Sequence, residues 1–369
     1  MSQIHTLTMP KWGLSMKEGR VDTWLKEAGA TIAKGDDLLD VETDKISSSV
    51  EAPFSGVLRR QVANQDETLP VGALLGIVVD GEASEEEIDA VVAQFLAGFT
   101  PDSDDAAASG PAPQKAEVGG RLLRYFDLGE GGTPLVLVHG FGGDLNNWLF
   151  NQPALAQQRR VIALDLPGHG ESAKALQQGT LDELSGAVLA LLDHLDVAKA
   201  HLAGHSMGGA VSLNLAAHAP ERVASLVLIA SAGLGEQING DYLQGFTAAS
   251  NRNALKPQLA QLFSDPGRVT RQMLEDMLKY KRLEGVGTAL STLATAMADG
   301  SRQRFALRDT VGTVPTLVIW GENDQIIPAA HAQGLNATKI TVLPGQGHMV
   351  QMEAAEQVNG LIEAFIGGL

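Results

Sequence analysis

Residues 197–217 read VAKAHLAGHSMGGAVSLNLAA, and this stretch decides the fold of the larger part of the chain. An apolar strand segment, Val197–Ala203, comes first, then the turn Gly204–Gly209, and then the helical segment Ala210–Ala217. Ser206 stands at the centre of the turn, between small residues that leave room for a sharply bent backbone. A strand, a tight turn with a serine and a helix in this order are typical of a nucleophile presented at the end of a strand.

A serine hydroxyl becomes a useful nucleophile only beside a base, a carboxylate that orients the base, and donors for an oxyanion. For this kind of turn the carboxylate and then the histidine follow the serine along the chain. Asp324 follows the strand segment 317–320, and His348 follows the segment 341–343. The sequence therefore predicts Ser206 as nucleophile, His348 as general base and acid, and Asp324 as the orienting carboxylate.

Other residues near these motifs are weaker candidates for the same roles. Glu322 is a second choice for the acid, and Asp165 is an alternative acid that precedes the serine and breaks the expected order. The remaining histidines in motifs are His139, His169 and His205. We expect these three to order loops rather than to take part in catalysis.

From Arg121 onward, apolar strand segments alternate with helical ones, as in a parallel sheet covered by helices. Residues 236–310 interrupt this alternation with mostly helical sequence, in the position and of the size of a lid inserted into the sheet domain. The expected strands are Leu135–Val138, Arg160–Leu164, Ala200–Ala203, Val223–Ala230 and Pro315–Trp320, and the expected helices include Leu181–Leu195 and Ala210–His218.

Residues 121–369 resemble the α/β-hydrolase superfamily. The resemblance rests on the serine turn, on LVLVHGFGG at 135–143 and on DLPGHGES at 165–172. Carried over by position, the backbone amides of Phe141 and Met207 form the oxyanion hole. The resemblance also implies the serine, histidine and acid roles given above.

Residues 3–80 are a different kind of domain. Short strand segments alternate with Gly-, Asp- and Pro-bearing turns, which predicts a small β-barrel or sandwich. The expected strands are Ile4–Met9, Gly19–Trp24, Asp37–Glu42, Ser47–Ala52, Gly56–Arg60 and Leu74–Val79.

Residues 81–120 are expected to hold a short helix and a flexible linker. Apolar residues recur at helical spacing between 84 and 98, behind Ser84 and Glu87 in a capping-box arrangement, and we expect this helix to pack on a neighbouring domain. Residues 101–120 show no apolar period and are polar and rich in Asp, Ala and Pro. We predict a linker there that lets the first domain visit a distant site.

Lys45 lies between two strand segments, in the sequence ETDKI, where a tight turn would project a lysine away from the barrel. Residues 3–80 resemble the lipoyl domains of 2-oxo acid dehydrogenase complexes, through MPKWGLSMKEG at 9–19, ETDK at 42–45 and APFSG at 52–56. The resemblance implies a biotinyl/lipoyl-like barrel-sandwich with lipoate on Lys45 as N6-lipoyllysine. Biotin carriers share this fold but usually have Met on both sides of the lysine, and here the flanks are Asp44 and Ile46.

The composition narrows the function classes further. A formal net charge of −17 argues against nucleic acid as a partner, because phosphate binding needs clustered Lys and Arg. The chain has no cysteine, which excludes disulfides and thiolate metal sites, and we expect no bound metal. With no membrane-length apolar run and no signal-peptide pattern, we expect a cytoplasmic protein that does not enter a membrane.

The whole chain resembles the dihydrolipoamide acetyltransferase components of acetoin dehydrogenase complexes, in which a lipoyl domain precedes an α/β-hydrolase-like domain. The resemblance implies an acyltransferase that moves acetyl from its own lipoyl arm to coenzyme A. It also implies three partners: a thiamine-diphosphate-dependent component that cleaves acetoin, dihydrolipoamide dehydrogenase, and the enzyme that attaches lipoate.

Two rival functions remain open. A serine hydrolase, either a thioesterase or a C–C bond hydrolase, would use the same three side chains with water as acceptor and keep the lipoyl domain as an address. A carrier protein with a vestigial hydrolase domain is the other, although an intact serine, acid and histidine in proper order speak against it. Oligomeric state and the coenzyme A site do not follow from the sequence.

Overall fold

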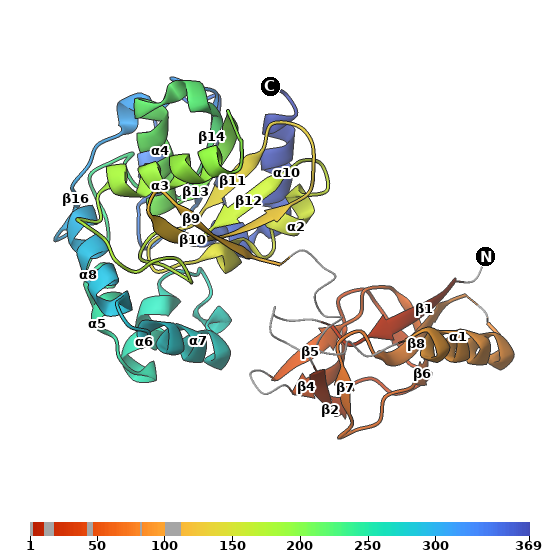
Figure 1. Ribbon diagram of the computed structural model, residues 1–369. Coiled ribbons are helices and arrows are strands. Elements are labelled where there is room, and N and C mark those ends of the chain that lie inside the picture. The colour runs from red at the N-terminus through yellow and green to blue at the C-terminus, as the bar shows by residue number, and fades with distance from the viewer. Residues whose placement is uncertain (1–2, 11–17, 43–46, 82, 100–111) are drawn as a thin grey trace. The chain divides into compact units, whose positions relative to one another are not determined.

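The computed structural model describes residues 3–10, 18–42, 47–81, 83–99 and 112–369. The chain divides into two compact units, Met1–Gly110 and Pro111–Leu369, and Figure 1 shows the strands and helices of each. No helix among the described residues is both long and apolar enough to cross a membrane.

The first unit is a sandwich of two antiparallel four-stranded sheets, which confirms the predicted all-β fold. Its inward-facing side chains are apolar, and Val21, Leu39 and Leu58 are fully buried between the sheets. One sheet has the order β1 (Gln3–Thr8), β8 (Leu74–Asp80), β6 (Gly56–Gln61), β3 (Thr31–Ile32), and the other β5 (Ser47–Glu51), β4 (Asp37–Glu42), β2 (Glu18–Trp24), β7 (Thr68–Pro70).

Helix α1 (Glu85–Gly98) follows β8 and packs on this sandwich. The capping box predicted from the sequence is present, since Ser84 Oγ accepts from the Glu87 N–H and the Glu87 carboxylate accepts from the Ser84 N–H. Ile88 is fully buried against Leu74 and its neighbours on β8. Arg59 of β6 donates to Glu85 at 2.6 Å. The helix therefore belongs to the first unit.

The second unit is built on one eight-stranded sheet. Six of its strands, β11, β12, β13, β14, β17 and β18, run parallel to one another, while β9 and β10 are antiparallel to their neighbours. This mixed sheet confirms the α/β-hydrolase fold. The strands, in spatial order, are β18 (Lys339–Leu343), β17 (Thr316–Gly321), β14 (Val223–Ile229), β13 (Ala200–His205), β11 (Leu135–Val138), β12 (Val161–Leu164), β10 (Arg121–Leu128) and β9 (Gln114–Val118).

Strand β9 differs from the expectation that the linker runs to residue 120. Its residues pair with β10 from Gln114 opposite Tyr125 to Val118 opposite Arg121. Val118 is buried in the core, whereas most of the strand faces solvent at the edge of the sheet. Residues 114–118 of the predicted linker are therefore an edge strand with polar outer side chains, and the second unit begins before Arg121.

Helices cover both faces of the sheet, because successive strand residues point to opposite sides. Val136 and Val138 of β11 join the core on one face, under α3 (Leu181–His194) and α4 (Met207–His218). Leu135 and Leu137 join the core on the other face, under a second set of helices. That set comprises η1 (Leu145–Trp148), α2 (Gln152–Leu155), α9 (Val350–Glu353) and α10 (Ala355–Ile366).

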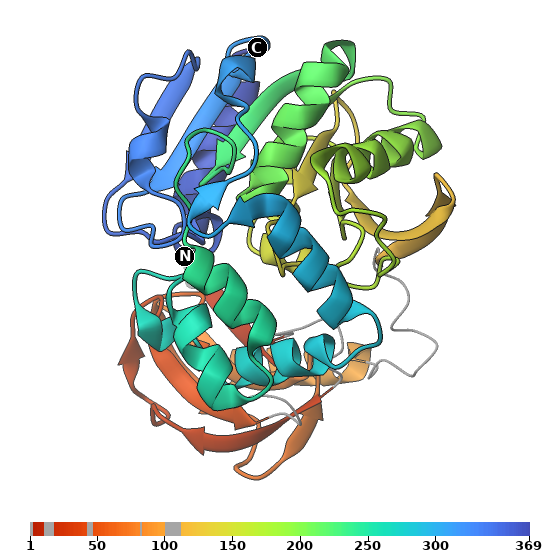
Figure 2. The ribbon, with the colours of Figure 1, turned by 90° about the vertical axis from the view of Figure 1, so that its left-hand side faces the viewer.

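Four helices between β14 and β17 form a lid at one end of the sheet, where Figures 1 and 2 show them side by side. They are α5 (Gly240–Ala248), α6 (Arg252–Ala260), α7 (Arg271–Lys281) and α8 (Val286–Met297). The small hairpin of β15 (Ala298–Asp299) and β16 (Arg302–Gln303) follows. Single turns η2 (Pro220–Arg222), η3 (Pro266–Arg268), η4 (Arg308–Thr310) and η5 (Ala329–Ala332) complete the unit.

Candidate active site

Ser206 stands on a strained turn between β13 and α4. Its backbone lies at φ 53° and ψ −118°, a conformation that L-residues rarely adopt. The flanking residues are glycines because there is no space for a side chain: a Cβ on Gly204 would lie 2.3 Å from the Gly208 carbonyl oxygen, and one on Gly208 2.1 Å from the Val138 carbonyl oxygen. Strain of this kind concentrates at functional sites, and it fits the predicted nucleophile.

The structure brings the predicted base and acid together. His348 Nδ1 donates to Asp324 Oδ2 at 2.8 Å, and both side chains are almost wholly buried. His205, next to the predicted nucleophile, donates from Nε2 to the His348 carbonyl oxygen at 3.0 Å, and the two imidazole rings lie 4.7 Å apart. The histidine loop is therefore fixed beside the serine turn. The described hydrogen bonds include none between Ser206 Oγ and His348 Nε2, a contact that often tightens only with substrate present.

Asp324 is held in one orientation by a set of donors. The N–H groups of Ile326 and Ile327 donate to Oδ1 at 2.8 and 3.0 Å, and Trp320 Nε1 donates to Oδ2 at 3.0 Å. These donors fix the carboxylate so that Oδ2 faces Nδ1 of His348, which leaves Nε2 of the same ring available for the predicted role of base. The sequence did not single out Trp320, because an indole on a buried strand looks like an ordinary core residue.

The two alternative acids are engaged elsewhere. Glu322 is exposed and accepts from the Gly345 N–H at 3.1 Å. Asp165 is fully buried and accepts from the backbone N–H groups of Leu145 and Glu171 at 2.8 and 2.7 Å. Neither carboxylate contacts His348 in the described hydrogen bonds, so the geometry favours Asp324.

Replacing Asp324 with asparagine is expected to lower kcat about 10³- to 10⁴-fold, because the amide cannot hold the imidazole in the required tautomer. Glu322→Gln is the matched control: the same change of acid to amide two residues away should leave kcat within about twofold. Steady-state rates of the predicted acetyl transfer measure both. Equal losses in the two variants would remove Asp324 from its assigned role.

Two other histidines in motifs pin loops together. His139 Nε2 accepts from the Leu166 N–H at 3.0 Å, and His169 Nε2 accepts from the Gly142 N–H at 3.1 Å. Both rings are fully buried, and burial lowers the pKa of each imidazole, that of His169 well below its usual value. They are neutral acceptors of backbone N–H groups, as a loop-ordering role requires.

The two predicted oxyanion donors have backbone N–H groups without an acceptor among the described residues. Met207 is the first residue of α4, so its N–H has no acceptor within the helix. The Phe141 N–H donates to no acceptor within the part of the chain that the structure describes. A Cβ on Gly140 would lie 3.0 Å from Ser206 Cβ, which places the Phe141 loop against the serine.

The predicted lid contacts the loop of Phe141 directly. Phe246 of α5 packs edge-on against Phe141 with ring centroids 5.7 Å apart. Lys281 Nζ donates to the Phe246 and Thr247 carbonyl oxygens at 2.5 and 3.1 Å and lies 4.7 Å from the centre of the Phe246 ring. This contact between α5, α7 and the loop is not visible in the sequence, because only the tertiary structure brings the three segments together.

Gly142 leaves the space that Phe246 occupies. It lies at φ 70°, and a Cβ there would stand 2.6 Å from Phe246 Cε1. We expect Gly142→Ala to displace the oxyanion loop, lowering kcat about 10-fold or more and stability by about 3 kcal/mol. In the control, Gly131→Ala, the φ is a similar 78° but no described atom lies within 4 Å, so only about 1 kcal/mol should be lost. Denaturant unfolding measures the stability of the two variants, and steady-state kinetics measures their kcat. If Gly142→Ala and Gly131→Ala have equal kcat values, the contact between Phe246 and the Phe141 loop does not affect catalysis.

Comparison with known proteins agrees with this architecture. Residues 133–355 match the model of the alpha/beta hydrolase fold, and residues 5–78 match the model described as biotin-requiring enzyme. A dihydrolipoyllysine-residue acetyltransferase component of the acetoin cleaving system from Pseudomonas putida is 75% identical, over 99% of each chain. The protein of the same name from Cupriavidus necator is 45% identical over 99% of this chain and 98% of its own.

The chain belongs to this acetyltransferase family. Among solved structures, a meta-cleavage product hydrolase from Pseudomonas fluorescens is 26% identical, with a TM-score of 0.62 over 69% of this chain and 97% of the hydrolase. The acetyltransferase family thus combines a biotinyl/lipoyl-like unit with a unit whose fold it shares with a meta-cleavage product hydrolase.

In this acetyltransferase, Lys45 lies in the connection between β4 and β5 and outside the described residues. The last described pair of this antiparallel hairpin is Glu42 opposite Ser47, and Glu42 is exposed. A lysine that carries a long arm must be reached by a lipoate-attaching enzyme, and the exposed end of a hairpin fits that requirement. The assignment of lipoate to Lys45 stays a prediction.

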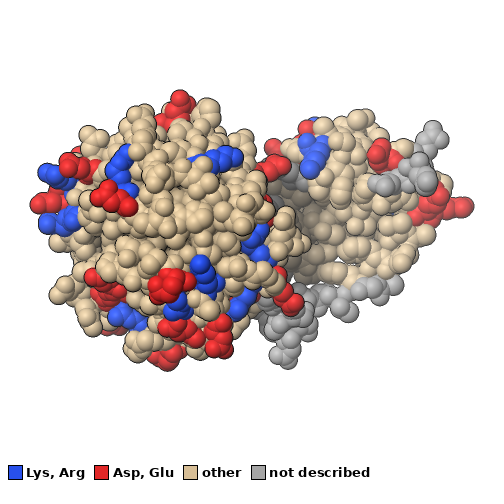
Figure 3. Space-filling model, turned by 90° about the horizontal axis from the view of Figure 1, so that it is seen from above, with Lys and Arg blue, Asp and Glu red and all other residues tan. Residues whose placement is uncertain are grey.

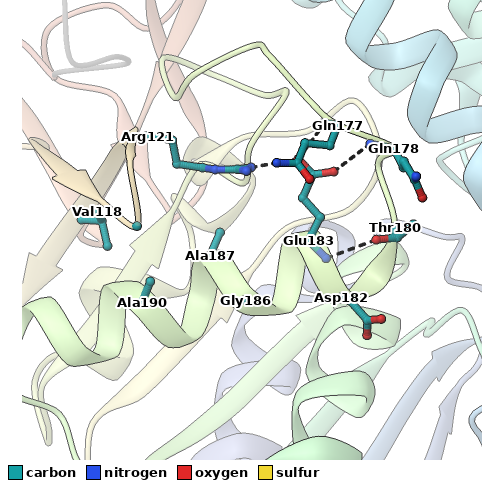
Figure 4. Close-up of a pocket in the computed structure, with 11 residues that line it drawn as sticks. Val118, Arg121, Gln177, Gln178, Thr180, Asp182, Glu183, Gly186, Ala187 and Ala190 are labelled. Atoms are coloured by element: carbon teal, nitrogen blue, oxygen red, sulfur yellow. Dashed lines mark hydrogen bonds and ion pairs between the residues drawn. The ribbon is translucent and has the colours of Figure 1, made fainter.

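A separate hollow of about 360 Å³ lies between β9, β10 and the start of α3, away from all the predicted catalytic residues (Figure 4). The groups in it that could bind an anion already donate hydrogen bonds to a carboxylate of the chain. Glu183 accepts from Arg121 and from the backbone N–H groups of Gln177 and Gly179, at 2.9 to 3.1 Å. The positive groups that could have held an anionic ligand are thus neutralised by a carboxylate of the chain itself.

Proposed function

We propose that this protein transfers an acetyl group from a lipoyl arm on its first unit to coenzyme A, with Ser206 as the nucleophile. The observation that carries the proposal is the buried pair of His348 and Asp324, fixed beside the serine turn in a chain that is 75% identical to an acetyltransferase of the acetoin cleaving system over 99% of its length. Lipoate on Lys45 would supply the acetyl group as a thioester.

The first half-reaction makes an acyl-enzyme. His348 Nε2 takes the proton of Ser206 Oγ, and the oxygen attacks the thioester carbonyl carbon. The N–H groups of Phe141 and Met207 stabilise the negative charge that develops on the carbonyl oxygen. When the carbon–sulfur bond breaks, His348 returns the proton to the departing thiolate, and acetyl-Ser206 remains.

The second half-reaction reverses the roles of the two thiols. His348 takes the proton of the coenzyme A thiol, whose sulfur attacks the acetyl carbon held on Ser206. The carbon–oxygen bond breaks, and the proton on His348 passes back to Ser206 Oγ. Electrons and protons balance without an oxidant or a metal ion, since one thioester replaces another.

Water competes with coenzyme A for the acetyl-serine, so the lid has to disfavour hydrolysis. Exchange of one thioester for another is nearly balanced, whereas hydrolysis runs downhill. Lid residues reach both sides of the predicted centre: Phe246 packs on Phe141, and the Met349 N–H next to His348 donates to the Leu262 carbonyl oxygen at 3.0 Å. These contacts support a lid that closes over the acetyl group.

The protein is a component of an acetoin cleaving system, as its relatives are named. We propose that the acetyl group reaches the arm from a thiamine-diphosphate-dependent acetoin-cleaving component, and that dihydrolipoamide dehydrogenase reoxidises the arm. Another enzyme of the cell must attach lipoate to Lys45.

A serine hydrolase is the second candidate function. The likeness of the second unit to a meta-cleavage product hydrolase favours it, because the same side chains could deliver water to the acyl-serine. The full-length identity to acetyltransferases favours transfer instead.

The test is a product measurement with acetylated dihydrolipoamide as donor. We expect acetyl-coenzyme A to form in proportion to the coenzyme A supplied. Acetate release without coenzyme A should be at least about 100-fold slower, and a factor of about 100 corresponds to a difference of less than about 3 kcal/mol in activation free energy. Acetate release at an equal rate, independent of coenzyme A, would identify a hydrolase.

A further inference from the structure

The lid carries a concentration of positive charge that the rest of its unit lacks. Residues 251–282, which include α6 and α7, contain seven Lys and Arg against three Asp and Glu. The other residues from 111 onward contain 12 Lys and Arg against 21 Asp and Glu. On the face of the second unit that Figure 3 shows, charges of both signs are interspersed. A basic segment in an acidic protein points to an anionic ligand.

Exposed basic side chains recur along α6 and α7, and an ion-pair cluster joins the two helices. Residues 271, 275, 279 and 282 follow one another at helical spacing on a single face of α7, and 252 and 256 do so on α6. Glu275 joins the two helices, because its Oε1 accepts from Arg271 at 2.9 Å and lies 3.1 Å from Arg252 Nη2. The lid face, as we call it, consists of five exposed side chains: Arg252, Lys256, Arg271, Lys279 and Arg282.

The lid face lies close to the predicted catalytic centre. The segment after α6 bonds to the histidine loop through the Leu262 carbonyl oxygen and the Met349 N–H. Lys281, at the end of α7, bonds to Phe246, whose ring packs on Phe141. At a rise of about 1.5 Å per residue, the nine residues of α6 span roughly 14 Å, which is the distance along the helix from Arg252 to the end that leads to the histidine loop.

We propose that the lid face binds the phosphate groups of coenzyme A. The inference rests on the proposed function and names the place where its acceptor is held. The thiol must reach Ser206, and the phosphates stand at the other end of a long flexible arm. Their several negative charges are costly to bury, so they belong at an exposed surface of Arg and Lys. Guanidinium groups bond phosphates with paired N–H donors, which suits Arg282, whereas Arg252 and Arg271 share the carboxylate of Glu275.

The experiment compares coenzyme A with pantetheine, which has the same thiol arm without the phosphates, as acceptor. The variant is Lys279→Gln with Arg282→Gln, and the control is Arg302→Gln with Arg304→Gln, which removes the same charge from exposed positions beside the β15–β16 hairpin. We expect KM for coenzyme A to rise about 10- to 100-fold in the variant alone, with KM for pantetheine and kcat at saturation unchanged.

Three outcomes would overturn the inference. An unchanged KM for coenzyme A would remove the phosphates from this surface, and an equal rise for both acceptors would show a disturbed lid. A rise in KM for the acyl donor alone, measured with the acetylated full-length protein, would assign the lid face to the acidic first unit as partner. Failure of the proposed function would give a different result. The protein without any substitution would then make no acetyl-coenzyme A at any concentration of coenzyme A.

Discussion

Ser206→Ala is expected to lower kcat for acetyl transfer to coenzyme A about 10⁴- to 10⁶-fold, the largest effect of any single change in the second unit. The substitution removes the oxygen that would hold the acetyl group between donor and acceptor, and neither His348 nor the oxyanion amides can replace it. Steady-state formation of acetyl-coenzyme A from acetylated dihydrolipoamide measures the loss. The activity that remains in Ser206→Ala would come from the direct attack of the bound coenzyme A thiol on the bound acetylated dihydrolipoamide.

Ser212→Ala is the matched control for this variant. Ser212 is a buried serine of α4 whose Oγ donates to the Gly208 carbonyl oxygen at 2.8 Å. Its loss should cost about 1 kcal/mol of stability and change kcat less than about threefold. If Ser206→Ala and Ser212→Ala are both folded and retain similar kcat values, the acyl-enzyme mechanism is wrong. The acetyl group would then pass directly from one thiol to the other.

Lys45→Arg is expected to abolish transfer that starts from acetoin while leaving the second unit intact. Arginine keeps the charge but cannot form the amide that attaches lipoate. Without lipoate, the protein has no tethered thiol to carry the acetyl group, whose effective concentration at the second unit would otherwise be in the millimolar range. Acetoin-dependent acetyl-coenzyme A formation should therefore fall at least about 100-fold. The rate with free acetylated dihydrolipoamide at saturation should stay within about twofold.

The control is Lys34→Arg, a change at an exposed lysine of the same unit. Intact mass after expression in a lipoylating host should show lipoate on the control and none on Lys45→Arg. Lipoate still present on Lys45→Arg would place the arm on another lysine. Equal loss of activity with free donor would show that Lys45 acts in the second unit's chemistry or folding.

Much of the fold could be predicted because its strands are short apolar runs between turn residues. The segment Leu135–Val138 coincides with β11, and Asp37–Glu42 coincides with β4. Strands β3 and β7 were not predicted, because two or three residues are too few to show alternation and their partners lie far away in sequence. Strand β9 looked like linker because its outer side chains are polar.

The site was predictable where chain order carries the information. The order of serine, acid and histidine selected Asp324 and His348, and the structure joins these two by a hydrogen bond. The supporting contacts were not predictable. Trp320 donates to the acid four residues later along the chain, which a sequence pattern does not distinguish from core packing, and Phe246 reaches Phe141 from more than 100 residues away.

The central claim is that the acetyl group passes through Ser206, and rapid quenching followed by peptide mass spectrometry tests it most directly. With acetylated dihydrolipoamide and no coenzyme A, we predict acetyl on the peptide that contains Ser206, and its disappearance within one turnover once coenzyme A is added. Acetyl-coenzyme A formed at the full rate, with no acetyl on that serine at any time, would contradict the account.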